Sequence, residues 1–422
     1  MRAVLKSAAA SGLHWSGAAL LLGRLTGRAR SPLVICYHRV VEDVRAHPRS
    51  APAMLTSVSM LERQLDWIGR RYRFASLDEV AAQLEEPTGP RFDRRPLAAV
   101  TFDDGYADVY HNALPVLWRK GIPAACFVIT GAVDGELPRL QHDELYTELQ
   151  RVHAAVGGER LIAMLRQLGA PLGDPRETGH RATARQVVEL VERLLVRCPR
   201  QQVGDLIASL RRESGGCDEE SSGVAEQDGL MSGAMLREIS GLGFTIGSHT
   251  RSHRVLPLER VEIAAAELFE SRRRLEQLLG VQVSHLAYPN GLFCPATVRA
   301  AARAGYRYAY TTCVHRDPEL PLLTIPRRCF SERSAAGAFR SFFPPVAACE
   351  VQGVFDLLRE CRHHGPRPST LRADPHPLQA RAGRRVAERR LPAAAAIHRS
   401  GAPHLSAAWS ECASGGGDGD GR

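Results

Sequence analysis

The alternation of short apolar runs with helical stretches constrains the fold of this 422-residue chain more than any other feature. Apolar runs stand at 32–40, 97–102 and 123–130, and similar runs recur between 244 and 330. Amphipathic helical patterns separate them, the longest at about 258–279. Strands that alternate with helices favour a parallel sheet. About seven strand candidates predict an α/β fold of the distorted (β/α) barrel type.

Two of the predicted helices carry capping boxes, in which a Ser side chain and a Glu three residues later satisfy the first free N–H groups. The pattern places one box at Ser59 and Glu62 and the other at Ser76 and Glu79. We therefore expect helices to begin directly after Ser59 and Ser76.

Three segments depart from the alternation. Residues from about 135 to 227 carry helical patches and a polar loop, which predicts a helical insertion within a barrel spanning 31–345. Residues 346–422 are rich in Arg, Ala, Gly and Pro, so we expect a disordered tail with at most one docked helix. Residues 1–30 place basic side chains around an apolar patch too short to span a bilayer. We expect an amphipathic segment that lies on a membrane or on the barrel.

The cysteines indicate the redox compartment of the protein, and the charge bears on whether it binds nucleic acid. Ten cysteines form no C-x-x-C pair, and several lie in apolar runs, which fits a reducing compartment. This favours a cytoplasmic or peripherally membrane-associated protein and leaves a secreted or envelope location open. The net charge of +9 comes with only 6% aromatics and no zinc-finger or RNA-binding signature, so no nucleic-acid partner is expected.

Two clusters of polar side chains follow apolar strands directly. "TFDDGY" ends in Asp103 and Asp104, and "GSHTRSH" carries His249 and His253. Taken singly, a turn or helix cap would explain the first cluster and coincidence the second. The carboxyl ends of barrel strands share one face, so two His and one carboxylate can meet there and hold a divalent cation. One Asp would bind the metal and the other would act as general base, both kept ionised by the metal's charge.

"TFDDGY", "HTRSH" and "AYPNG" occur in this order and together resemble the motifs of the polysaccharide deacetylases, carbohydrate esterase family four. The resemblance covers about residues 31–134 and 228–330. The "YHRV" opening and the helical insertion are similar to the exopolysaccharide-associated branch. The resemblance implies a distorted barrel that uses a divalent metal to hydrolyse the acetamide groups of N-acetylhexosamine polymers and release acetate. The expected partner is thus an N-acetylated glycan.

The resemblance also implies roles for single residues. Asp103 would be the catalytic base, and Asp104, His249 and His253 would bind the metal, with Zn²⁺ expected and Co²⁺ or Ni²⁺ as alternatives. The backbone N–H of Tyr288 would stabilise the oxyanion of the tetrahedral intermediate. The alternative for Tyr288 is an ordinary Tyr at a strand end before a Pro turn.

Two departures from the family pattern leave alternatives open. No Arg precedes the Pro of "AYPNG", so we expect Arg327 or Arg328 to tether the base, with a surface position as the alternative. The Leu-x-His motif that supplies the general acid is missing, so we assign the acid role to His38, with a structural His as the alternative. An inactive glycan-binding relative that supports exopolysaccharide synthesis is the competing function. The sequence does not determine the polymer or the oligomeric state.

Overall fold

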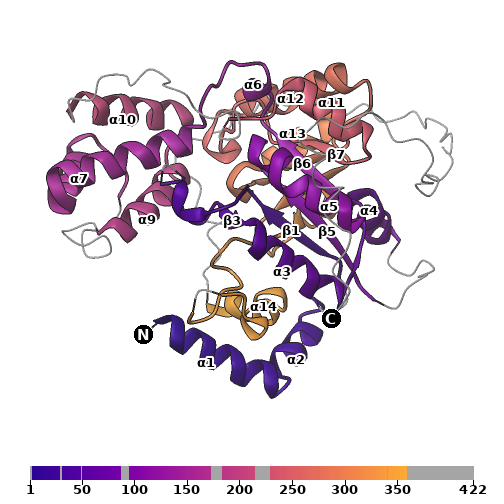
Figure 1. Ribbon diagram of the computed structural model, residues 1–422. Coiled ribbons are helices and arrows are strands. Elements are labelled where there is room, and N and C mark those ends of the chain that lie inside the picture. Colours follow the sequence, from indigo (N-terminus) through magenta and orange to yellow (C-terminus); the bar gives the residue numbers. More distant parts are fainter. Residues whose placement is uncertain are drawn as a thin grey trace, which may run out of the picture. The chain divides into compact units, whose positions relative to one another are not determined.

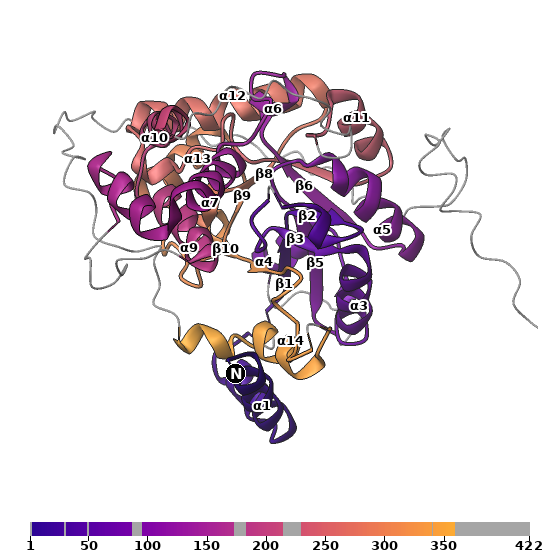
Figure 2. The same ribbon diagram turned by 60° about the vertical axis from the view of Figure 1, so that its left-hand side comes forward.

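The barrel is built from parallel strands that are joined by helices on the outside (Figures 1 and 2). The computed structural model describes residues 2–28, 31–48, 50–86, 95–172, 183–213, 229–339 and 341–358. The barrel strands are β1 (Leu33–Tyr37), β5 (Leu97–Phe102), β6 (Ala124–Val128), β7 (Thr245–Ser248), β8 (His285–Ala287), β9 (Tyr308–Thr311), β10 (Ile325–Pro326) and β11 (Arg328–Cys329). They follow the order β10-β9-β8-β7-β6-β5-β1-β11, and every pairing is parallel.

One short stretch of chain brings the two ends of this path together. β10 pairs with β9 and β11 pairs with β1, and only Arg327 separates β10 from β11. The stretch from 325 to 329 therefore acts as one strand that bridges both edges of the sheet. Counted this way the barrel has seven strands, which confirms the predicted distorted (β/α) barrel. β4 (Arg73–Phe74) adds to β5, and β2 (Arg39–Val41) and β3 (Leu55–Ser57) form a separate ladder.

The strands form as the sequence predicts because their apolar runs are buried on both faces. Every residue of β1, β5 and β6 is buried. The helices around them are α3 (Val58–Gly69), α4 (Leu77–Glu85), α5 (Leu114–Lys120), α6 (Thr130–Val133), α11 (Gly233–Gly241), α12 (Val261–Leu279) and α13 (Pro295–Ala304).

The two predicted helix caps differ in outcome. The box of Ser76 and Glu79 is present at the start of α4, as predicted. The box at Ser59 is wrong by two residues, since α3 is capped by Ser57, whose hydroxyl accepts the Met60 N–H. Ser57 is the last residue of β3, so the chain leaves the extended conformation there and the helix begins earlier than the sequence pattern indicated.

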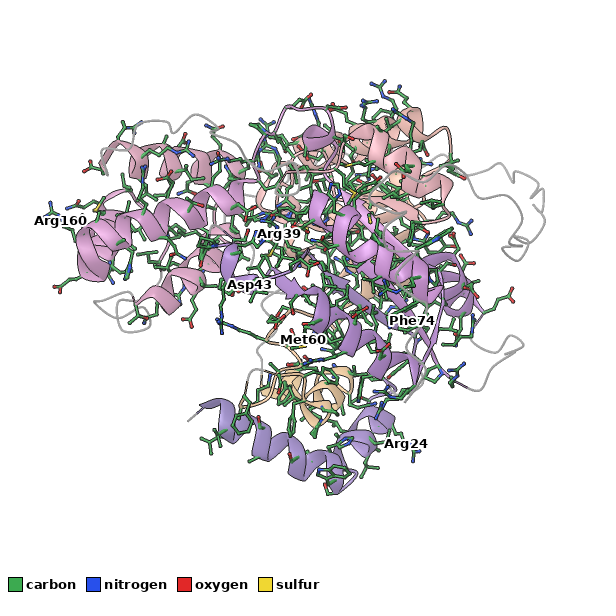
Figure 3. All side chains as sticks on the ribbon, viewed as in Figure 1. Arg24, Arg39, Asp43, Met60, Phe74 and Arg160 are labelled. Atoms are coloured by element: carbon green, nitrogen blue, oxygen red, sulfur yellow. The ribbon has the colours of Figure 1, made fainter. Side chains whose placement is uncertain are left out.

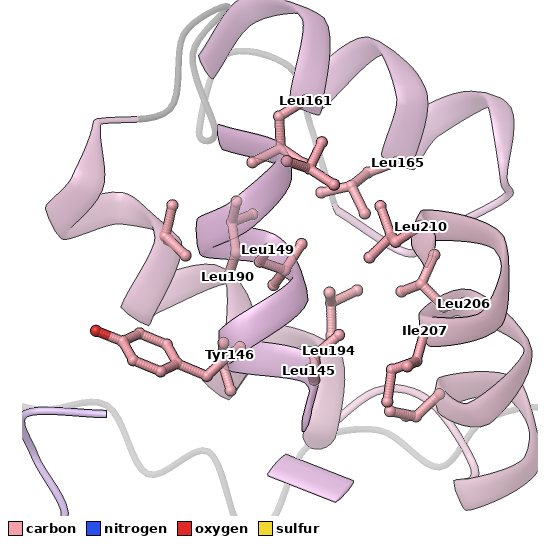
Figure 4. Packing of buried hydrophobic residues seen from close by; sticks show 14 of the residues in the cluster. Leu145, Tyr146, Leu149, Leu161, Leu165, Leu190, Leu194, Leu206, Ile207 and Leu210 are labelled. Carbon is pink, nitrogen blue, oxygen red and sulfur yellow. The ribbon is translucent and has the colours of Figure 1, made fainter. Parts of the chain in front are cut away.

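The insertion consists of α7 (Gln141–Gln167), α9 (Ala184–Leu195) and α10 (Arg200–Glu213). α7 is broken at Gly157, which has a φ of 79°. These helices have a hydrophobic core of their own (Figure 4), with buried residues that include Leu145, Leu149, Leu161, Leu165, Leu190, Leu194, Leu206, Ile207 and Leu210. The insertion is therefore a small helical bundle beside the barrel.

Two N-terminal helices, α1 (Arg2–Trp15) and α2 (Ala18–Leu25), pack with α14 (Pro344–Val351). A 3₁₀ turn at Val354–Leu358 follows α14. The folded part of the chain thus runs past residue 345, where the sequence analysis ended the barrel, because α14 has an apolar face for α1 to cover. The predicted tail lies outside the described residues from 359 onward. None of the described helices is long and apolar enough to cross a membrane.

Candidate active site

The two predicted polar clusters meet at one end of the barrel. Asp104 follows β5, and His249 and His253 follow β7. The potential ligand atoms of these three residues all lie within 4.8 Å of one another. The Nε2 atoms of His249 and His253 are 3.6 and 3.4 Å from Asp104 Oδ1. A carboxylate oxygen and two imidazole nitrogens that converge in this way form a donor set for a divalent cation.

Asp104 has an environment that a carboxylate alone does not tolerate. Its side chain is buried, and among the described residues neither of its oxygens has a hydrogen-bond partner. Burial raises the pKa of this carboxyl well above its usual range, and the negative charges of Asp103 and Asp143 raise it further. Leaving a buried carboxylate unpaired is costly, and a cation would remove that cost. The residues therefore fit a divalent metal.

The two histidines are held in the form that binds metals. The Nδ1–H of His249 donates to the Ala287 carbonyl oxygen at 2.8 Å, which leaves the Nε2 lone pair free to face Asp104. Burial lowers the pKa of His249 and lowers that of His253 well below its usual value, where His249 and His142 add to the effect. Both rings are therefore neutral at pH 7, as metal ligation requires.

The backbone around the site is held in unusual conformations. In the described part of the chain the non-glycine residues with positive φ are Asp104 (71°), Thr250 (68°), His253 (57°) and Asn290 (55°). Left-handed φ for such residues costs about 1–3 kcal/mol each and persists only where the surroundings enforce it. All four follow the strands β5, β7 and β8 at the same end of the barrel, where the candidate metal ligands also lie.

Hydrogen bonds fix the loop after β7 in this conformation. The Thr250 N–H donates to the Ser248 hydroxyl, and the His253 N–H donates to the Thr250 hydroxyl, each at 3.1 Å. Glu267 on α12 accepts the backbone N–H groups of Arg251 and Ser252 at 3.0 and 2.8 Å. The loop therefore keeps the two histidine rings in place through contacts with its own side chains and with a neighbouring helix.

Asp103 makes a buried ion pair with Arg327. Both oxygens of the carboxylate accept from the guanidinium at 2.7 Å, and the Cys36 thiol donates to one of them at 3.3 Å. Burial would raise the pKa of Asp103, but the charge and hydrogen bonds of Arg327, aided by His249, hold it well below its usual range. Asp103 is thus ionised. Arg328, the other candidate, pairs with Asp356 instead.

Arg327 comes from the stretch that joins the two ends of the sheet. Its neighbours Pro326 and Arg328 belong to β10 and β11, so the side chain enters the barrel where the two sheet edges meet. The guanidinium also donates to Thr101 on β5 at 3.1 Å. The ion pair therefore links the closing strand of the barrel to the strand that carries Asp103.

The insertion supplies a further histidine that the sequence analysis missed. His142 lies in the first turn of α7, and its Nε2 is 3.9 Å from Asp104 Oδ2. The Tyr106 hydroxyl donates to Asp143 at 2.6 Å and lies 2.7 Å from the same Nε2. A phenol has one proton, so the His142 Nε2–H donates to the phenol oxygen. Arg39, near the middle of Figure 3, covers the Tyr106 ring with its guanidinium 4.8 Å from the ring centre.

A cleft of about 820 Å³ opens over these groups. It is lined by His38, Asp103, Asp104, His142, His249, His253 and Arg327 on the barrel side. Val188, Val191 and Leu195 of α9 form part of its wall, and Asn290 lines it beyond β8. The insertion thus shapes the space above the barrel site.

Comparison with known proteins finds a matching family. The model of the family described as polysaccharide deacetylase matches residues 92–157 and 221–309. In these two stretches the chain matches the polysaccharide deacetylase family. The two matched stretches contain all four residues of the predicted base and metal set, whereas His38 and Arg327 lie outside them. No curated protein matches the chain significantly.

Several solved structures are similar to this chain. The deacetylase PplD of Streptococcus pyogenes, in complex with acetate, is 17% identical, with 72% of this chain and 94% of that chain covered and a TM-score of 0.45. IcaB of Ammonifex degensii is 19% identical, with 76% and 97% covered and a TM-score of 0.44. The BpsB deacetylase domain of Bordetella bronchiseptica is 16% identical, with 71% and 95% covered and a TM-score of 0.40.

His38 lies beside Asp103. It follows β1, and one of its ring nitrogens lies within 4.8 Å of a carboxylate oxygen of Asp103 and of the Cys36 sulfur. Burial lowers the pKa of His38 to about 4, a shift that the negative charge of Asp103 opposes. His38 is therefore neutral at pH 7.

The prediction for Tyr288 is wrong. Its backbone N–H donates to the Tyr310 carbonyl oxygen at 3.0 Å, and its side chain is fully buried. The reason is that β9 extends alongside this position and takes up the N–H. Asn290, two residues later, lies in the cleft wall instead. The sequence "PNG" carries a signal for this, since Asn before Gly favours turns with left-handed φ.

Proposed function

We propose that the chain hydrolyses the acetamide groups of N-acetylhexosamine residues in a polysaccharide, with a divalent cation held by Asp104, His249 and His253. The observation that carries this proposal is the buried Asp104 carboxylate. Within the described part of the chain it accepts no hydrogen bond, and it faces two neutral imidazoles. A protein that only binds glycans has no need to maintain so unfavourable an arrangement.

The two imidazole nitrogens and the Asp104 oxygen would leave coordination positions on the cation for water and substrate. This donor set suits Zn²⁺, with Co²⁺ or Ni²⁺ as alternatives. When bound, the cation supplies Lewis-acid stabilisation of the negative charge that develops on the acetamide oxygen. The side chains around it provide the proton transfers. The turn at Asn290 is assigned to the oxyanion side of the cleft in place of Tyr288, because it lines the cleft.

Asp103 is assigned as the general base. It accepts a proton from the water whose oxygen adds to the acetamide carbon. The Arg327 guanidinium keeps the carboxylate ionised and fixes its orientation through two hydrogen bonds of 2.7 Å. Because the pKa of Asp103 is held low, the carboxyl gives up the captured proton readily.

His38 is assigned to proton delivery. A neutral imidazole does not serve as an acid until it has gained a proton, and the carboxylate of Asp103 lies within 4.8 Å of it. The proton then passes from Asp103 through His38 to the amine nitrogen as the C–N bond breaks. The products are acetate and a free amine on the sugar, and both side chains return to their starting states.

The test is acetate release from N-acetylglucosamine oligomers, measured on the purified chain before and after chelation and after Zn²⁺ or Co²⁺ is added back. Asp103→Asn is expected to lower kcat/KM by about 10²–10⁴-fold while the metal content stays the same. Asp104→Asn is expected to lose the metal as well. Asp134→Asn, which changes an exposed carboxylate paired with Arg274, is the control and should behave like the wild type.

Metal-dependent release that Asp103→Asn abolishes supports the proposal. A chain that binds metal and acetylated glycan but releases no acetate from chitin oligomers, poly-N-acetylglucosamine or peptidoglycan would overturn it in favour of a glycan-binding protein.

A further inference from the structure

The outer side of α1 and α2 carries a concentration of exposed apolar side chains. This N-terminal apolar face consists of Val4, Leu5, Leu13, Trp15, Leu20, Leu21 and Leu25. Trp15 and Leu25 are 79% and 77% exposed. Nearly half of the large apolar residues that are exposed in the described part of the chain lie in these two helices. Exposed apolar patches of this kind mark interaction surfaces.

The opposite side of the same helices is anchored to the rest of the protein. Ala10, Ala19 and Gly23 are buried there, and α2 passes so close to Gln352 that a side chain at Gly23 would clash with it. Small residues thus face inward and large ones outward, the reverse of an ordinary surface helix.

Two ion pairs hold this arrangement in place. Lys6 pairs with Glu350 at 3.3 Å, and Arg28 pairs with Asp356 at 3.0 Å. The helices are therefore docked through their small residues and their charges, which leaves the large apolar side chains exposed.

The charge of this region indicates what covers the face. The first 31 residues contain five Lys or Arg and no Asp or Glu. Arg24 on α2 is exposed (Figure 3). Because this segment is basic, a second copy of the face would be repelled. An apolar surface within a basic segment is complementary to a bilayer with anionic headgroups.

We propose that α1 and α2 lie on an anionic lipid bilayer, with the N-terminal apolar face inserted at the level of the headgroups. Trp15 suits this position because its ring is apolar and its N–H remains hydrated. Glu350 and Asp356, which anchor the helices, also line the active-site cleft. Membrane binding would therefore hold the cleft close to the lipid surface.

The test is co-sedimentation of the full chain with vesicles of phosphatidylcholine alone or mixed with phosphatidylglycerol. We expect binding to the mixed vesicles that weakens at high salt. The triple variant Trp15→Ser, Leu21→Ser, Leu25→Ser should lose at least about tenfold in affinity for the mixed vesicles, because it inserts less apolar area. The three side chains are exposed, so folding should be unaffected. Phe269→Ser, at a 56% exposed position on α12, is the matched control and should bind like the wild type.

The proposal is overturned if the wild type does not sediment with the mixed vesicles, or if the triple variant binds them as well as Phe269→Ser does. It is also overturned if the wild type dimerises without lipid and the triple variant is a monomer, since a second copy would then cover the face. Acetate release from soluble oligomers should be the same in the wild type and the triple variant. That measurement separates failure of this proposal from failure of the proposed activity.

Discussion

The barrel and the helical insertion place side chains at the same site in different ways. The barrel provides Asp103, Asp104, His249 and His253 at strand ends, where the sheet ladder and the closing strand fix each backbone position. The insertion reaches the site with the first turn of α7, which is tied to the barrel through Tyr106. The predicted base and metal ligands thus come from the barrel, and the insertion adds His142.

The two regions also differ in how they are stabilised. Buried strand residues such as Val34, Ala99 and Phe127 form part of the barrel core. The insertion has a separate core of mostly leucines from α7, α9 and α10 (Figure 4). A change within one core should therefore be felt mainly in that region. Four substitutions, each with a matched control, test this difference, from the largest expected effect to the smallest.

Arg327→Gln should have the largest effect, because it leaves the Asp103 carboxylate buried without its cation. Removing one partner of a buried pair costs about 3–5 kcal/mol of unfolding free energy. The pKa of Asp103, now held low, would rise, so the acid side of the kcat/KM profile should move to higher pH. The stabilisation from the pair is present above the unfolded pKa of about 3.9 and is lost as pH falls through the lower folded pKa.

Denaturant unfolding and a pH–rate profile measure these effects. Arg328→Gln is the matched control, since the neighbouring Arg pairs with Asp356 instead. Equal unfolding midpoints and equal pH profiles for the two variants would show that the Asp103–Arg327 pair does not have the role described.

Leu149→Ala should come next, with a loss of about 2–5 kcal/mol from the cavity it opens in the insertion. Leu149 is fully buried on α7. Hydrogen exchange should show reduced protection in α7, α9 and α10 and little change in the barrel strands. Leu286→Ala on β8, also fully buried, should do the opposite. Protection that falls equally across both regions in either variant would mean that the two cores unfold as one unit.

His142→Gln should lower kcat/KM by about tenfold, or about 1.4 kcal/mol, because the insertion loses the contact of His142 with Tyr106 and Asp104. Metal content should stay at the wild-type level, in contrast to Asp104→Asn. His153→Gln, on the same helix, is the control. A metal content that falls along with activity would make His142 a ligand rather than a positioning residue.

Arg251→Gln should have the smallest effect. Arg251 pairs with Glu136 and Glu270 at 3.0 and 2.8 Å, but all three side chains are exposed. Such pairs contribute about 0–1 kcal/mol and are screened by salt. Thermal unfolding at low and high salt should show at most a small difference. A loss as large as that of Arg327→Gln would mean that the contact near Glu136 is essential to the loop after β7.

The sequence by itself determined the features that depend on local pattern. Alternating strands and helices predicted the barrel, and the apolar run before Asp103 and Asp104 placed them at a strand end. The spacing of His249 and His253 after another strand brought them to the same face. The capping box at Ser76 was also correct. Each of these depends on residues that are close together in the chain.

Only the tertiary structure decided which distant groups meet. Arg327 reaches Asp103 across 224 positions of sequence because the barrel closes at that residue. His142 enters the site because α7 begins beside Tyr106. Tyr288 is excluded because its N–H pairs with Tyr310 of the next strand. Sequence periodicity records which side of an element is buried, whereas these contacts depend on which elements become neighbours in three dimensions.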